Sequence, residues 1–119
     1  MKLEKFVRIL GEPWRVMMCS SEVEPRLKKL SGFCDQTSHF IGISDPKEKN
    51  GNIDNEVELV KQIIRHEIIH AFMYASGLGD SWEHKEYGHD ETIVDWMALQ
   101  FRKIEVAINE VEGALIFDE

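Results

Sequence analysis

Two histidines and a glutamate lie within five positions of an otherwise apolar stretch, His66-Glu67-Ile68-Ile69-His70. Burying polar groups among apolar residues costs free energy unless they find partners. On a helix, residues four positions apart project from the same face, so the imidazoles of His66 and His70 can reach one ion. Glu67 is offset by about 100° around the helix axis and can act on water at that ion. This H-E-x-x-H spacing predicts a metal site with a general base.

A catalytic zinc site usually has three protein ligands and a fourth position for water. Glu91, 21 residues after His70, is the candidate for the third ligand. Asp95 follows four positions later on the same helix face and can accept the free N–H of a ligand histidine, which fixes the orientation of that ring. The sequence therefore predicts His66, His70 and Glu91 as metal ligands, Glu67 as the catalytic base and Asp95 as a support for a ligand.

Two histidines just before Glu91 leave the third ligand open. Either His84 or His89 can replace Glu91, or can instead stabilise the negative charge that develops during hydrolysis. Tyr74 and Tyr87 are alternatives for that second role, although Tyr74 is more simply explained as a core residue.

Helical spacing dominates the second half of the chain. Asn55 is a typical N-cap residue with Glu58 three positions later, and the apolar residues that follow predict a central helix to about Ser76. A last helix begins near residue 89 or 90. Its predicted buried stripe consists of Ile93, Met97, Phe101, Ile104, Ile108 and Val111.

The first half of the chain predicts short strands. Residues 13–19 alternate, with Trp14, Val16 and Met18 on one face, and residues 32–35 and 38–44 form a predicted hairpin. Residues 20–30 have the spacing of a short helix. We expect the strand at 38–44 to be an exposed edge to which an extended substrate can add.

Composition limits the classes of function. The chain has 119 residues, which predicts a single domain over 1–119, and its formal net charge is −8. That charge argues against direct binding of nucleic acid or of an anionic membrane surface. The apolar start of the chain is too short for a signal peptide, so we expect a cytoplasmic protein in which Cys19 and Cys34 are free thiols.

The segments HEIIH and ETIVD resemble the gluzincin branch of the H-E-x-x-H metallopeptidases. The longer stretches RHEIIHAFMYASGLG and DETIVDWMALQF are similar to the minimal zinc-peptidase-like domains of the ImmA/IrrE kind and to small proteins of phages and prophages. The resemblance implies a small α+β, zincin-like domain, with a short N-terminal β-sheet packed beside the active-site helix and a C-terminal helix. It implies the same roles for the same residues as above.

The function expected from these observations is zinc-dependent hydrolysis of a peptide bond in a protein or peptide. In the ImmA/IrrE group the implied target is a repressor. The main alternative is a non-catalytic, zinc-stabilised module that binds a partner protein, and a hydrolase with a non-peptide substrate is another. An intact Glu67 favours the enzyme, since a structural site needs no general base. The sequence makes no prediction about oligomeric state.

Overall fold

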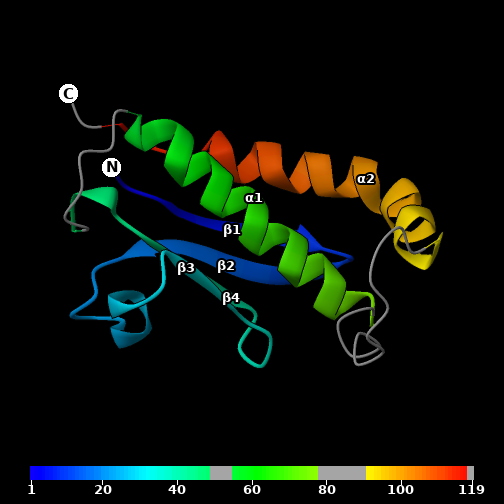
Figure 1. The fold of residues 1–119 in the computed structure, drawn as a ribbon, viewed down its shortest axis with the longest axis horizontal. Helices are drawn as coiled ribbons and strands as arrows, with labels where there is room; N and C mark the ends of the chain where they lie inside the picture. Colours follow the sequence, from blue (N-terminus) through cyan, green and yellow to red (C-terminus); the bar gives the residue numbers. More distant parts are fainter. Residues whose placement is uncertain (49–54, 78–90, 118–119) are drawn as a thin grey trace.

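The computed structural model describes residues 1–48, 55–77 and 91–117, excluding the side chains of residues 91, 92, 94, 95 and 98. It is an α+β fold in which two helices cover one face of a four-stranded mixed sheet (Figure 1). This confirms the predicted fold class. The elements, in chain order, are β1 (Glu4–Ile9), β2 (Glu12–Cys19), η1 (Pro25–Lys28), β3 (Gly32–Asp35), β4 (Phe40–Ser44), η2 (Pro46–Glu48), α1 (Glu56–Ala75) and α2 (Glu91–Glu112).

The strand order is β1-β2-β4-β3. The predicted hairpin is confirmed, because β3 and β4 pair antiparallel, but the prediction that residues 38–44 form an exposed edge is wrong. β4 also pairs with β2, in parallel, and so lies inside the sheet. Its run of buried residues, from Ile41 to Ser44, is typical of a strand covered on both faces. The edge strand beside α1 is β3.

The main core lies between the sheet and the helices. Trp14, Val16, Ile41 and Ile43 are buried on this face of the sheet, and Met18 packs against the same core. The prediction that Trp14, Val16 and Met18 share one face is therefore confirmed. On the opposite face a smaller cluster is formed around Leu27 of η1, which contacts Cys19 and Phe33.

Two strand-region features differ from the sequence predictions. β1 was not predicted. It forms a hairpin with β2 through a turn at Leu10 and Gly11, which both have positive φ, as the central residues of a type I′ turn do. The predicted helix over residues 20–30 is wrong, since only a 3-10 turn, Pro25–Lys28, forms. Pro25 lacks a backbone donor and disfavours helical geometry at Glu24, which is extended.

The central helix confirms its predicted ends. The Asn55 side chain accepts a hydrogen bond from the Glu58 N–H at 3.0 Å, and Gly77 has a φ of 82°, a conformation that glycine adopts without strain. In α2 the buried stripe is centred on Ile104, Ala107 and Val111. Phe101, predicted to be buried, lies at the margin of this stripe and is 56% exposed.

The helices run antiparallel, as two contacts between them show. Arg65 of α1 lies 3.8 Å from the Glu112 carboxylate of α2, and Trp96 of α2 donates a hydrogen bond to the Ser76 hydroxyl beyond the end of α1. The two cysteine thiols are free, as expected, since Cys19 and Cys34 belong to clusters on opposite faces of the sheet. None of the described helices has the length and apolar character needed to cross a bilayer.

Candidate metal centre

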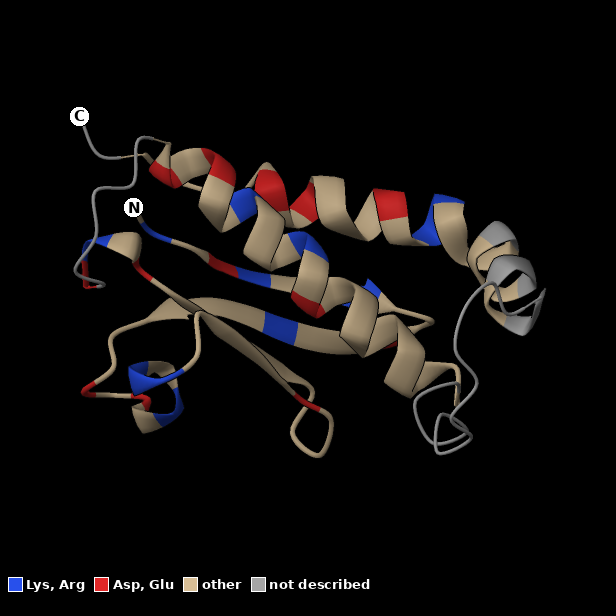
Figure 2. Cartoon of the chain, viewed as in Figure 1, with Lys and Arg blue, Asp and Glu red and all other residues tan. Residues whose placement is uncertain are grey.

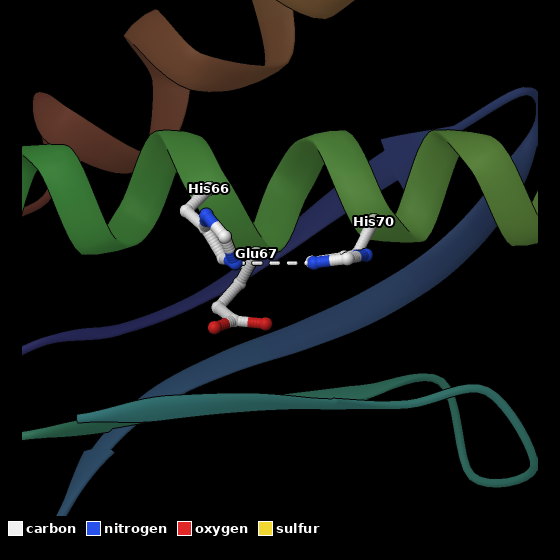
Figure 3. Close-up of side chains that lie close together, drawn as sticks. All are labelled: His66, Glu67 and His70. Atoms are coloured by element: carbon white, nitrogen blue, oxygen red, sulfur yellow. Dashed lines mark hydrogen bonds between the residues drawn. The ribbon is translucent and has the colours of Figure 1, made fainter. Parts of the chain in front are cut away.

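The two histidines of α1 face each other. The Nε2 atoms of His66 and His70 lie 3.1 Å apart, and Figure 3 shows both rings projecting from the same side of the helix. Two Zn–N bonds of about 2.0–2.1 Å at a tetrahedral angle hold their nitrogens roughly 3.3–3.4 Å apart. The pair is therefore within a few tenths of an ångström of the spacing that a single tetrahedral ion requires.

Glu67 completes a group of three potential ligands. One ligand atom from each of His66, Glu67 and His70 lies within 4.8 Å of the others, so this group can hold a metal ion. Its chemistry, two imidazoles and a carboxylate, suits a borderline divalent metal. The helix alone creates this arrangement, since the three residues lie within five positions of it.

The Glu67 side chain points away from α2 and toward the sheet (Figure 3), and the residue is only 6% exposed. Its neighbour there is Gly32 of β3, where an added Cβ would lie 3.1 Å from the Glu67 Oε2 and 2.7 Å from the Ile63 Cγ2. The missing side chain at Gly32 thus leaves room for the carboxylate between strand and helix.

Burial controls the protonation of the site. It raises the pKa of Glu67, an effect that the nearby His66 partly opposes. It also lowers the pKa of His70, and His66 lowers it further. Both shifts favour uncharged groups: a carboxyl whose pKa is closer to neutrality, as a general base needs, and a neutral imidazole, the form that binds metals.

A hollow of about 330 Å³ opens beside the pair. It lies between α1 and the start of β3, and its lining is formed by Ser31, Gly32, Leu59, Gln62, Ile63, His66 and Glu67. A ligand in this hollow would contact Glu67 and His66 directly.

The edge of β3 beside this hollow has backbone groups available for pairing. The Ser31 carbonyl accepts a hydrogen bond from the Ser44 N–H of the neighbouring chain segment. Because hydrogen-bonded and non-hydrogen-bonded pairs alternate along an antiparallel ladder, the amide groups of Gly32 and Cys34 point away from β4. In the described part of the chain no further strand pairs with them.

Cys34 lies near the metal centre, where the sequence analysis predicts no role for it. Its half-buried side chain packs on the helix face of the sheet. Burial, together with the charges of Glu67 and Asp35, raises the pKa of its thiol to about 12. The thiol is therefore protonated at neutral pH. The alternation of residues 32–35 was the signal that could have placed Gly32 and Cys34 on the face toward α1.

Most of the remaining predicted site residues lie outside the described part of the chain. α2 begins at Glu91 and includes Asp95, but both side chains lie outside the described part of the chain, as do His84, Tyr87 and His89 entirely. Tyr74 is exposed and lines a different hollow, with Trp14 and His39.

Comparisons with protein-family models, with curated proteins and with solved structures gave no match for this chain. The site therefore rests on its own residues: a pair of converging imidazoles, a buried carboxylate and an adjacent open strand edge.

Proposed function

We propose that this protein is a zinc-dependent peptidase. The observation that carries the proposal is the 3.1 Å approach of two imidazole nitrogens beside the carboxylate of Glu67, which is buried at the edge of a hollow. A structural metal site needs no carboxylate beside the ion that does not bind it, whereas hydrolysis needs a general base at that position.

In the proposed reaction His66 and His70 hold the ion, and zinc when bound supplies Lewis acidity that lowers the pKa of water to about 7 and polarises a carbonyl. Glu67 takes a proton from the attacking water, whose oxygen forms a bond to the carbonyl carbon. As the C–N bond breaks, Glu67 returns that proton to the leaving amine. Gly32 keeps the Glu67 carboxylate free to make both transfers, because no side chain fills the space beside it.

The outer edge of β3 is the proposed binding surface for the peptide, in place of β4. An extended chain that pairs with the Gly32 and Cys34 amides would run alongside α1, next to Glu67. Backbone pairing of this kind accepts many sequences, and the side chains of the substrate would then meet the hollow lined by Leu59, Gln62 and Ile63.

Glu91 remains the proposed third ligand and Asp95 the proposed support for a ligand histidine. Trp96 of α2 lies beside Ser76, the residue directly after α1. Because the helices run antiparallel, α2 begins at Glu91 beyond that end of α1, so the assignment of Glu91 as a ligand rests on the sequence spacing alone.

The proposal is tested by incubating the zinc-loaded protein with casein and with a mixture of synthetic peptides, and by identifying new termini with mass spectrometry. We expect cleavage that stops when His66 or His70 is replaced by Ala. A protein that binds one zinc per chain and cuts none of these substrates would contradict the peptidase proposal and favour a zinc-stabilised interaction module.

A further inference from the structure

A second hollow, larger than the one beside His66, lies on the other side of α1 from the histidines. It has a volume of about 710 Å³ and opens between the β1–β2 turn and the middle of α2. Phe72, which lines it, follows His70 by two positions and so projects from roughly the opposite side of the helix. The hollow is thus separate from the candidate metal centre.

Apolar groups form the inner lining of this hollow. Phe72 is only 1% exposed and closes its depth, whereas Leu10 and Val106 are substantially exposed at its sides. Exposed aliphatic side chains that converge on one concave surface are typical of a ligand site, and the volume is within the range of small-molecule pockets, roughly 300–1,000 Å³.

Cations surround the apolar lining. Arg8 of β1 approaches from one side, and Arg102 and Lys103 of α2 from the other. Within the described residues none of the three forms an ion pair; the Arg8 guanidinium donates only to the Gly11 carbonyl, at 2.9 Å. Figure 2 shows a blue segment near the middle of α2, with red segments between it and the C-terminal end of that helix.

This concentration of positive charge is unusual for the chain, whose net charge is −8. One carboxylate, Glu110, also lines the hollow, so its lining has a formal charge of 3 − 1 = +2. Charges of one sign around a low-dielectric hollow attract ligands of the opposite sign. Two arginines add planar donor groups that match the geometry of carboxylates and phosphates.

We propose that this hollow binds a small organic anion with an apolar body and an oxyanion head group, such as a medium-chain carboxylate. The body would lie on Phe72, Leu10 and Val106, and the head group would be bound by Arg8, Arg102 and Lys103. The volume of about 710 Å³ suits a small molecule whose apolar body fills the hollow.

The test is binding of decanoate and decyl phosphate, below their micelle concentrations, to the whole chain in EDTA, measured by calorimetry and by NMR shifts of backbone amides. The neutral control ligand is decanamide. We expect both anions to bind, decanamide to bind much more weakly, and the shifts to centre on Phe72 and Val106 rather than on His66. Equal binding of decanamide would overturn the anionic part of the proposal, and absence of binding would overturn all of it.

Variants separate the head-group and body contacts. Arg102→Gln and Lys103→Gln should each weaken decanoate binding roughly two- to fivefold, the range for partly exposed ion pairs. Val106→Glu, at a position that is 57% exposed and so leaves folding intact, should abolish binding by placing a negative charge in the hollow. The matched control Lys29→Gln, at an exposed lysine outside the hollow, should leave binding unchanged.

Two other results would contradict the proposal: an equal effect of Lys29→Gln and Arg102→Gln, and binding to vesicles of anionic phospholipid but not to monomeric decanoate. Because all measurements use metal-free protein, failure here leaves the peptidase proposal intact. A failure of the peptidase proposal likewise leaves this binding site untouched.

Discussion

Replacing Glu67 by Gln changes one atom of a buried side chain and separates catalysis from metal binding. The amide has nearly the same shape as the carboxylate, and the space beside Gly32 accepts it without movement. His66 and His70 keep their 3.1 Å spacing, because the helix alone positions them. The variant therefore retains the metal site and loses the base.

The expected loss of turnover follows from the role assigned to Glu67. General base catalysis contributes about 10²- to 10⁴-fold, so the barrier rises by roughly 3–5 kcal/mol. The same substitution should raise the stability of the metal-free protein. Burial raises the pKa of Glu67, so the folded metal-free protein holds a proton that the unfolded chain has already released. The protonated carboxyl therefore contributes its whole stabilising effect at pH values below its pKa in the unfolded chain. This contribution is lost as the pH rises through its pKa in the folded protein.

The Gln variant carries no such group, so in EDTA it should melt at a higher temperature than the wild type at pH 8, and the difference should shrink toward pH 4. The assay pairs peptide cleavage with zinc content per chain and thermal melts at both pH values. Glu105→Gln, at an exposed position of α2, is the matched control and should change none of these. Turnover equal to wild type, or loss of zinc from Glu67→Gln, would refute the reasoning.

Three further outcomes are expected. Gly42→Ala should lower the free energy of unfolding by about 1–3 kcal/mol, because the new Cβ would overlap the buried ring of Phe33. In urea titrations the double variant with Phe33→Leu should recover part of that loss. Additive effects of the two substitutions would contradict the contact. Burial and nearby carboxylates raise the pKa of the Cys34 thiol to about 12. Cys34 should therefore react with iodoacetamide at pH 8 far more slowly in native than in urea-unfolded protein. Equal rates would show that the thiol is accessible and has an ordinary pKa. Glu91→Ala should weaken zinc binding, measured by competition with a chelator, more than His89→Ala does; the reverse ranking would make His89 the third ligand.

The parts of the fold that local patterns encode were predictable. The central helix has an N-cap at Asn55, a glycine stop at Gly77 and a continuous apolar stripe, and each of these signals acts within a few residues. The two histidines and Glu67 meet because of helix geometry alone. The approach of the two histidines could therefore be predicted without knowing how the rest of the chain folds.

The features that depend on tertiary pairing were not predictable in this way. Whether residues 38–44 lie at an edge or inside the sheet depends on β2 pairing with β4 across the intervening segment, which local alternation does not determine. β1 is recognisable only once β2 is beside it. The helix predicted over residues 20–30 does not form, because the backbone donor missing at Pro25 outweighs the helical spacing of the apolar residues.

Phe101 shows a similar limit. Its spacing fits a helix stripe, but the direction in which α2 packs on α1 and β1 centres the buried face on Ile104 and Ala107. The hollow lined by Arg8 and Arg102 was also not predictable from local patterns. These two residues are far apart in the sequence and come together only through the packing of β1, α1 and α2.

The most direct test of the central claim is a crystal structure of the zinc-loaded protein, with anomalous data collected on both sides of the zinc absorption edge. We predict one zinc per chain, within about 2.0–2.1 Å of the imidazole nitrogens of His66 and His70. An anomalous peak elsewhere, or no zinc in protein exposed to an excess of the ion, would contradict the account.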